Sequence, residues 1–533
     1  MALTSIHLHD SPVLLTLFCY ALSCLVILFT DRFALPKRER RKHRPPTRPK
    51  DHVIEALARL PVIFLVFAGF FAISWRPLYA GAGTMSFFII FTAISRAKFK
   101  FIREPLVFSD IALVADVFKY KSIFYANSLN IVFWTVAFLY VFGVSGLYMY
   151  FEPDLIPDRH WFIWAVIMLA IADVPWLLLF YGPVNRLTAD MVRKIVGKPS
   201  ARVSTIRFGT FTSVVFHFIM WLGARREKIV SELQERFFAA VQDLIGHDAD
   251  NKAPLVIVWQ SESFLDMRRL GVDTLALPTM DRLQKRASQW GLLATVFEGG
   301  YTLRTEFAVL SGLLPDDLHV DASYPYLRAS HYTDVVWPTK LKNAGWSTHF
   351  IHPYDRTFFL RHKAMPQLGF EKMTMLDEFA HDVARDGPYV SDATLTEKVI
   401  EQVEAQTDAK GSLLFVASMA NHGPWEPGRC GELTDPVSIY LEILQQSDAA
   451  LGTLVDHLDA LDRPVWLVFY GDHAPLLKSF ADPFPDPRTD YFIVPLGSVR
   501  NARGSSVPAQ TEEPWNLFEA MLKHANLQKD ELQ

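Results

Sequence analysis

Residues Pro254–Phe264 read PLVIVWQSESF, and this stretch decides the fold of the second half of the chain. Its first six residues are apolar without a break, which is typical of a parallel strand covered on both faces. Polar residues, Glu262 among them, follow at once. Positions just beyond the carboxyl end of a strand are where doubly wound sheets bind ligands. The stretch therefore predicts an α/β sheet with functional groups at one edge.

Short apolar runs of the same kind recur further along and predict more strands. These runs are Thr348–Ile351, Ser412–Ser418, Val465–Tyr470 and Tyr491–Pro495. Helical patterns lie between them, for example at Leu395–Val403 and Tyr440–Leu461. Alternating strands and helices predict an α/β domain whose sheet is mostly parallel and covered by helices.

Residues that can ligate a metal follow three of these runs. Glu262 follows the first run, and His422, Asp472 and His473 follow two others. Acids at strand ends often only cap helices, but three such clusters on one edge favour a common site. An oxygen and nitrogen ligand set without a thiolate suits zinc or manganese. His352 follows the run Thr348–Ile351 and is expected to line the acceptor side of the site, unless it is an ordinary surface residue.

A hydroxyl nucleophile is suggested by residues Glu298–Gly312, which read EGGYTLRTEFAVLSG. The glycines allow a tight turn, and the apolar spacing after Thr305 is helical. Thr302 then lies near a helix N-terminus, where anions are favoured. A hydroxyl needs a lowered pKa to act as a nucleophile, and a divalent metal supplies it. Alternatively, Thr302 or Thr305 is simply a helix cap, with Glu306 in the first turn.

Long apolar segments occupy the first 223 residues and predict five or six membrane-spanning helices. They are Ser11–Thr30, Ala56–Trp75, the shorter Ala80–Ile94, Asn130–Phe151, Trp161–Tyr181 and the marginal Phe208–Gly223. Ser11–Thr30 lacks a basic region before it and a cleavage site after it, so we expect a retained anchor rather than a signal peptide. The mean hydropathy of +0.14 agrees with a chain that is part membrane and part soluble.

The distribution of charge predicts an orientation. The densest run of lysines and arginines lies in the loop Asp31–His52, which suits a cytoplasmic loop, whereas the loop Glu152–Arg159 is acidic. Six spans then place everything after Gly223 outside the cytoplasm. Five spans with the N-terminus inside do the same but put the basic loop on the outer face, so six are favoured.

Composition and charge divide the chain and exclude some classes of protein. We expect a transmembrane region over residues 1–223, a linker helix over 224–252 and an extracytoplasmic catalytic domain over 253–533. A net charge of −4 excludes a globally basic nucleic-acid binder. Three cysteines in 533 residues exclude a disulfide scaffold and a cysteine-based zinc domain.

Five segments, taken together, resemble the alkaline phosphatase/sulfatase superfamily, and within it the lipoteichoic acid synthase-like membrane phosphoglycerol transferases. These segments are WQSESF, GGYTLRTEF-x-x-LSG, FIHPYDRTFFLRHKAMPQLGF, ANHGPW and YGDHAP, in the order of the family. The resemblance extends to the plan of the chain, with several spans, a linker helix and an alkaline-phosphatase-like α/β domain outside the cytoplasm.

The resemblance implies roles for individual residues. It implies one divalent metal, with Mn²⁺ favoured and Zn²⁺ or Mg²⁺ as alternatives. Its ligands would be Glu262, Asp472, His473 and Thr302. Thr302 would also be the nucleophile, with Thr305 as its competitor. His422 would contact the phosphoryl group of the substrate, and Arg361 the phosphate or glycerol.

The activity that the resemblance implies is a two-step transfer at the bacterial inner (plasma) membrane, with the catalytic domain in the periplasm. Thr302 would attack the head group of phosphatidylglycerol, release diacylglycerol and leave a phosphothreonine. A hydroxyl of a cell-envelope glycan or polymer would then accept the phosphoglycerol. The partners would be the lipid donor, the acceptor and the bilayer, with no nucleic acid, and the identity of the acceptor stays open.

Three other functions remain in competition. A phosphoethanolamine transferase is one, although its family tends to have disulfide-rich outer domains and this domain has only Cys430. A sulfatase-like hydrolase or phosphodiesterase is another, but Thr302 is followed by Leu-Arg-Thr instead of the x-Pro-x-Arg of sulfatases. A transporter or scaffold with a structural metal is the third, and the spans lack the buried charges of a transport path.

Overall fold

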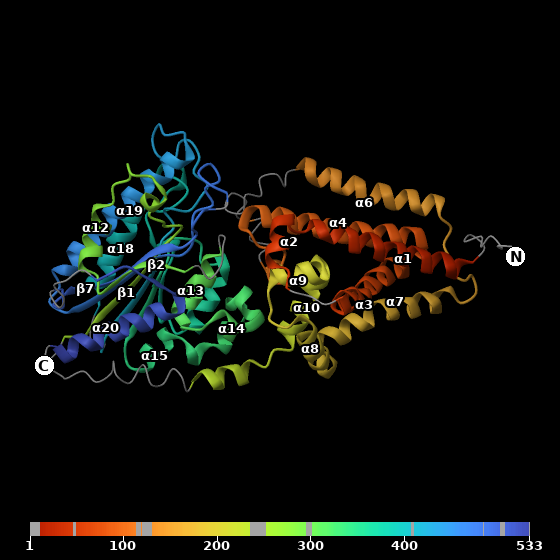
Figure 1. The fold of residues 1–533 in the computed structure, drawn as a ribbon, viewed down its shortest axis with the longest axis horizontal. Coiled ribbons are helices and arrows are strands. Elements are labelled where there is room, and N and C mark those ends of the chain that lie inside the picture. The colour runs from red at the N-terminus through yellow and green to blue at the C-terminus, as the bar shows by residue number, and fades with distance from the viewer. Residues whose placement is uncertain are drawn as a thin grey trace. The chain divides into compact units, whose positions relative to one another are not determined.

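The computed structural model consists of two compact units, residues 1–224 and 225–533, which are described separately (Figure 1). The residues that the structure describes are 11–45, 49–112, 119, 131–234, 252–294, 301–406, 410–482, 484–500 and 507–531. Part of the expected linker helix, residues 235–251, falls outside them. Residues 226–234 are helical.

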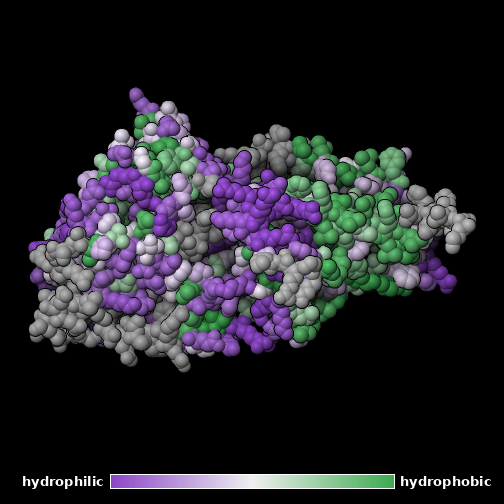
Figure 2. Space-filling view, in the orientation of Figure 1, coloured by the Kyte–Doolittle hydropathy of each residue, from purple (hydrophilic) through white to green (hydrophobic). Residues whose placement is uncertain are grey.

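The first unit is helical, and four of its helices are long and apolar enough to cross a membrane. They are α1 (Pro12–Thr30), α3 (Pro49–Ser74), α4 (Pro77–Ile102) and α7 (Trp161–Phe180). The apolar helix α6 (Ile131–Phe151) coincides with another expected span. Many large apolar side chains of these helices are exposed, and Figure 2 shows the hydrophobic surface that they form. Such a surface is suited to contact with lipid.

Two expected spans differ from the helices that form. Helix α4 runs on to Ile102, beyond the expected end at Ile94, and Lys98 near its end is paired with Glu104 and Asp110. The expected span Phe208–Gly223 forms helix α10 (Thr210–Leu222), which has 13 residues. A helix of that size is about 20 Å long, which is too short for the ~30 Å of hydrocarbon in a bilayer.

The second unit contains an eight-stranded sheet with the order β4-β3-β5-β1-β6-β7-β2-β8. The expected strands form β1 (Leu255–Ser261), β3 (Ser347–Ile351), β5 (Ser412–Ala417), β6 (Pro464–Gly471) and β7 (Thr489–Gly497). The pairs among β4, β3, β5, β1 and β6 are all parallel, whereas β7 is antiparallel to β6 and β2. The prediction of a mostly parallel sheet is therefore confirmed.

Three strands were not expected from the sequence, two at the edges of the sheet and one next to an edge. They are β2 (Gln289–Leu293), β4 (Lys372–Thr374) and β8 (Gln510–Glu512). Strand β2 contains Gly291, whose φ is +145° and where a Cβ atom would lie 2.1 Å from the Gln510 carbonyl oxygen. The close approach of β8 therefore requires glycine at this position, and a glycine inside a run weakens the sequence signal for a strand.

Helices cover the sheet (Figure 1). A core of buried apolar residues joins β1, β5 and β6 to α12 (Pro278–Arg286), α18 (Asp392–Glu404) and α19 (Pro436–Asp459). These strands are buried along almost their whole length, as their unbroken apolar runs predict. Helix α20 (Leu517–Glu531) contacts β6 as well.

The register of the three central strands positions the site. Gln260 of β1 is paired with Ala417 of β5 on one side and with Tyr470 of β6 on the other. The residues that follow these three strands are therefore neighbours at one edge of the sheet. Glu262 is among them, and Asp472 follows β6 directly.

Candidate metal centre

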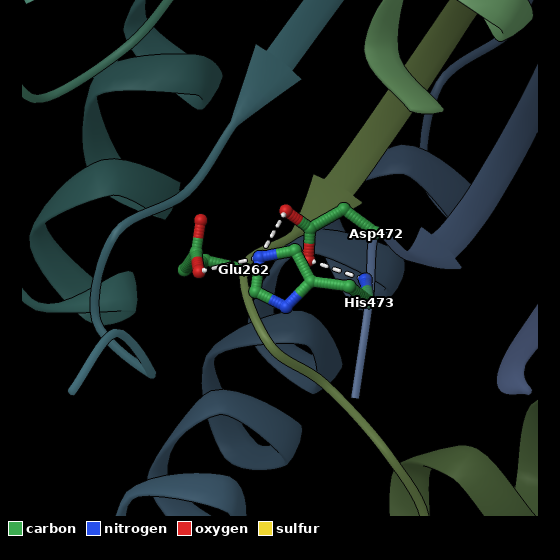
Figure 3. Close-up of side chains that lie close together, drawn as sticks. All are labelled: Glu262, Asp472 and His473. Carbon is green, nitrogen blue, oxygen red and sulfur yellow. Dashed lines mark hydrogen bonds and ion pairs between the residues drawn. The ribbon is translucent and has the colours of Figure 1, made fainter. Parts of the chain in front are cut away.

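Three potential metal ligands converge where β1 and β6 end (Figure 3). One ligand atom each from Glu262, Asp472 and His473 can be chosen so that all three lie within 4.8 Å of one another. His473 Nε2 lies 3.4 Å from Glu262 Oε1 and 3.4 Å from Asp472 Oδ2. All three residues are buried, with at most 5% of their surface exposed. Two carboxylates and an imidazole that lie close together and are buried from solvent form a typical cation site.

Asp472 is held by the backbone on one side only. Its Oδ1 accepts hydrogen bonds from the backbone N–H groups of Ser263 and His473, both at 2.8 Å. Its Oδ2 is buried and has no hydrogen-bond partner among the described residues. Burial and then the charge of Glu262 raise the pKa of Asp472. A bound cation would both occupy Oδ2 and offset this repulsion.

His473 is oriented as a ligand by its own loop. Its Nδ1 lies 3.1 Å from the Ala474 carbonyl oxygen. A carbonyl can only accept, so Nδ1 carries the proton and Nε2 has a lone pair in the neutral ring. Burial lowers the pKa of His473, but the carboxylates of Asp472 and Glu262 more than offset this and raise it. Such fixing of the distal nitrogen is usual for histidines that bind metals.

The two threonines of α13 (Thr302–Ser311) are placed differently. Thr302 is the first residue of the helix, and its Oγ1 lies 3.2 Å from Glu262 Oε2 and 3.4 Å from His473 Nε2. The Thr305 hydroxyl instead donates to the Asp472 carbonyl oxygen at 2.9 Å. Neither side chain caps the helix, since the N-cap residue is Tyr301. Only Thr302 thus brings its hydroxyl into the cluster of ligands.

Three polar residues beside the ligands hold the ends of the strands. Ser418 Oγ, just after β5, accepts the backbone N–H of Glu262 at 3.1 Å. The Ser263 hydroxyl donates to Glu262 Oε1 at 2.7 Å, and Ser263 adopts a φ of +50°. Asn421 Nδ2 donates to the Ser261 hydroxyl at 3.4 Å. Ser263 lies in the segment WQSESF and Asn421 in ANHGPW, whereas the position of Ser418 after a strand was the only signal for it in the sequence.

His422 lies after β5 and is held through one nitrogen. Its Nδ1 is 2.6 Å from the Gly423 carbonyl oxygen and 3.2 Å from the Tyr389 hydroxyl. Burial is the main reason that the pKa of His422 is lowered to about 4, and His473 contributes. His422 is therefore neutral at pH 7, with a proton on Nδ1 and a lone pair on Nε2. Tyr389 comes from a loop without a recognisable motif, so the sequence did not point to it.

Arg361 and His352 lie in a fully buried polar group. Arg361 Nε and Nη2 donate to the two carboxylate oxygens of Glu306, at 3.1 and 2.9 Å. Arg361 Nη1 is 3.2 Å from His352 Nε2, and His352 Nδ1 is 2.9 Å from the Ala417 carbonyl oxygen. Burial and then Arg361 lower the pKa of His352 well below its usual value. Each of the three guanidinium nitrogens of Arg361 already has a partner within the protein. Contact of Arg361 or His352 with a substrate therefore stays a prediction.

The residues present fit a divalent cation. The set offers two carboxylates, the Thr302 hydroxyl and the Nε2 lone pair of His473, with the otherwise unpartnered Asp472 Oδ2 among them. Oxygen-rich sets with one imidazole suit manganese, zinc or magnesium. The two glycines that precede Tyr301 in the predicted turn lie outside the described residues.

Comparison with known proteins gives both a family and relatives. The sequence model of the family described as Sulfatase matches residues 254–526. The chain is 71% identical over 533 residues to the capsular polysaccharide biosynthesis protein RkpI of Rhizobium meliloti (strain 1021). That alignment covers 100% of this chain and 98% of the relative.

Solved structures give more distant similarity. The phosphoglycerol transferase GacH of Streptococcus pyogenes, in complex with sn-glycerol-1-phosphate, matches with a TM-score of 0.44 and 20% identity. The match covers 56% of this chain and 82% of that one. The lipooligosaccharide phosphoethanolamine transferase A (EptA) of Neisseria meningitidis matches with a TM-score of 0.49 and 12% identity, over 94% of this chain and 93% of that one.

Proposed function

Because the chain belongs to the sulfatase family of the alkaline phosphatase superfamily, we propose that it is a membrane-bound phosphoglycerol transferase. Its donor is phosphatidylglycerol, and its acceptor is a hydroxyl of an envelope polysaccharide. One observation carries the proposal, namely the Thr302 hydroxyl among the three ligands Glu262, Asp472 and His473. A nucleophile inside a metal site is suited to transfer through a covalent intermediate.

The first half-reaction forms a phosphothreonine. Thr302 Oγ1 bonds to the phosphorus of the lipid head group and gives up its proton, the bond from phosphorus to the diacylglycerol oxygen breaks, and that oxygen takes up a proton so that diacylglycerol leaves as the alcohol. The hydrogen bond from Thr302 to Glu262 Oε2 gives the hydroxyl proton an acceptor. One divalent ion, with Mn²⁺ favoured, would be held by Glu262, Asp472, His473 and Thr302 and would stabilise negative charge on the reacting oxygens.

The second half-reaction releases Thr302. An acceptor hydroxyl bonds to phosphorus, the bond from phosphorus to Thr302 Oγ1 breaks, and the phosphoglycerol moves to the acceptor. His422 is neutral and has a lone pair on Nε2, which suits it to bind the incoming hydroxyl or the phosphoryl group. Arg361, which is paired with Glu306, stays the candidate for contact with the phosphate or glycerol, and His352, next to Arg361, the candidate for the acceptor side.

The acceptor is proposed from the relative at 71% identity, whose name places it in capsular polysaccharide biosynthesis. We accordingly favour a capsular or related surface polysaccharide of a Gram-negative envelope over a teichoic acid chain. The helices anchor the enzyme in the inner membrane, where its lipid donor resides, and the catalytic unit works in the periplasm.

The length of helix α10 affects how many times the chain crosses the membrane, and therefore on which side the N-terminus lies. Because α10 has only 13 residues, we propose the five-span alternative, with the crossings formed by α1, α3, α4, α6 and α7. An odd number of crossings puts the N-terminus in the cytoplasm when the catalytic unit is outside. The basic segment that follows α1 then lies on the outer side of the bilayer.

The test is release of the head group by the full-length protein. Purified protein with Mn²⁺ and fluorescent phosphatidylglycerol should release fluorescent diacylglycerol, and Thr302→Ala should abolish the release. Thr305→Ala is the matched control, since it removes the same hydroxyl one helical turn away and should retain most of the activity. Release by Thr302→Ala would move the nucleophile elsewhere, and release from phosphatidylethanolamine alone would change the donor.

A further inference from the structure

A basic cavity lies in the helical unit, where α1 ends and α3 begins. It has a volume of about 820 Å³ and is also lined by α2 (Lys37–His43) and α9 (Ala201–Phe208). Seven of its sixteen lining residues are lysine or arginine and two are carboxylates, which leaves five positive charges in excess. Figure 2 shows a hydrophilic surface where Figure 1 places α2, beside the hydrophobic surface of the long helices.

Both carboxylates of the lining are already paired with an arginine. Asp31 Oδ2 lies 3.3 Å from Arg59 Nη1, and Glu55 Oε1 lies 2.8 Å from Arg207 Nε. Asp31 is packed so closely against Gly209 that a Cβ atom there would lie 1.8 Å from its Oδ2. These pairs bind α1, α3 and α9 together, and they leave the charge of the remaining cations uncompensated.

Those remaining cations have no ion pair in the part of the chain that the structure describes. They are Arg32, Lys37, Arg40, Arg41 and Arg44. Deeper in the lining, Arg59 Nε and Thr205 Oγ1 are buried without a hydrogen-bond partner among the described residues, and so is Arg40 Nε. Arg59 is 8% exposed and Thr205 is 2% exposed. Buried donors without acceptors are rare and costly, and an anion with several oxygens would satisfy them.

The surroundings of the cavity favour a lipid as the source of that anion. Phe33 and Leu57 each follow a lining residue directly in the chain, and they are 53% and 56% exposed. Apolar side chains beside a basic cavity at a helix end are what a phosphate with attached acyl chains requires. Arginines are also the side chains best suited to bind phosphate oxygens. We propose that this cavity binds the phosphate of an anionic phospholipid head group.

The cavity lies at the end of the helical unit where the chain leaves it. Arg207, in the lining, donates to the Val196 carbonyl oxygen at the end of α8 (Gly182–Val196), at 2.9 Å. Arg193 of the same helix donates to the carbonyl oxygen of Gly223 at 2.8 Å. A lipid bound in this cavity would be kept on the face of the bilayer at which the enzyme uses its donor. That link to donor supply rests on the proposed function, whereas lipid binding itself does not.

Binding is tested with the full-length protein in detergent and EDTA, by calorimetric titration with dioctanoyl phosphatidylglycerol, dioctanoyl phosphatidylcholine and inorganic phosphate. The variant is Arg40→Gln/Arg41→Gln, which removes two cations of the lining. The matched control is Arg38→Gln/Lys42→Gln, which removes two cations of the same helix that do not line the cavity. EDTA keeps the readout independent of turnover, so failure of the catalytic proposal would not affect it.

We expect phosphatidylglycerol to bind wild type and the control alike, and the variant about tenfold to thirtyfold more weakly. Phosphatidylcholine, which has no net charge, should bind weakly to all three proteins. An equal loss of affinity for phosphatidylglycerol in the two double variants would overturn the proposal. Binding would then depend on the overall positive charge of α2 and not on the cations that line the cavity. Tight binding of inorganic phosphate without binding of the lipid would overturn the lipid as the source.

Discussion

Arg361 and Glu306 form a buried ion pair across 55 residues of sequence, in which Arg361 Nη2 lies 2.9 Å from Glu306 Oε2. Neither side chain is more than 1% exposed. Glu306 also accepts hydrogen bonds from Gln260 Nε2, at 3.1 Å, and from the Tyr326 hydroxyl. Glu306 thus ties α13, which carries Thr302, both to Arg361 and to β1, which ends just before Glu262.

Breaking this pair should destabilise the second unit, residues 225–533, strongly. Glu306→Gln leaves Arg361 as a buried charge without its partner, which costs about 3–5 kcal/mol. The double variant Glu306→Gln/Arg361→Met should lose less than the sum of the two single variants, because no charge remains uncompensated. Chemical unfolding of the full-length protein, followed by tryptophan fluorescence, measures the difference. Additive losses would show that the two side chains are not coupled.

Gly471, directly before Asp472, should not tolerate any larger residue. A Cβ atom at Gly471 would lie 2.1 Å from the carbonyl oxygen of Phe264, which is backbone and has no rotamer to change. Gly471→Ala should therefore displace the end of β6, reduce metal binding and cost about 1–3 kcal/mol. Metal content and Tm are the measurements. Gly146→Ala, in α6, meets nothing within 4 Å and is the control, which should bind metal as wild type does.

Removal of the metal should expose the repulsion between two carboxylates. Without a cation, burial and the neighbouring Glu262 raise the pKa of Asp472. EDTA should lower the Tm of the wild type, because the ion stabilises only the folded state to which it binds. Asp472→Asn should contain little metal and should show almost no response to EDTA. An equal fall in Tm in this variant would mean that EDTA acts at another site.

Asp392 should make the second unit less stable above about pH 6 than at pH 4. Burial raises its pKa to about 6, and hydrogen bonds from Ser447 and Ser418 only partly oppose this. A raised carboxyl pKa means that the folded state binds more protons, so the contribution to stability falls as pH rises from about 4 to 6 and stays low above it. Asp392→Asn should therefore gain about 1–3 kcal/mol at pH 8 and little at pH 4.

Chemical unfolding at pH 4, 6 and 8 measures this dependence. Asp273→Asn, at an exposed position, is the matched control and should leave the difference between pH 4 and pH 8 as it is in wild type. A gain from Asp392→Asn that is the same at all three pH values would contradict titration of this carboxyl group.

Much of the second unit could be predicted from the sequence because its signals are local. An unbroken apolar run specifies a strand buried on both faces, and β1, β5 and β6 form where such runs occur. Glu262 and Asp472 could be predicted as neighbours because the carboxyl ends of parallel strands share an edge. Strand β2, which lies between β7 and β8, could not be predicted, because its glycine is required by the close approach of β8, more than 200 residues away in the sequence.

The tertiary structure decided matters that depend on contacts between distant residues. Thr302 and Thr305 are near-equivalent in a helical pattern, and only packing against the Asp472 carbonyl oxygen occupies the Thr305 hydroxyl. The pairing of Arg361 with Glu306 was likewise not visible in the sequence, and contact of Arg361 with the substrate stays a prediction. The basic segment after α1 predicted only an orientation. Folding combines its charges with Arg59 and Arg207 into a cavity, because helix packing joins residues that local patterns cannot relate.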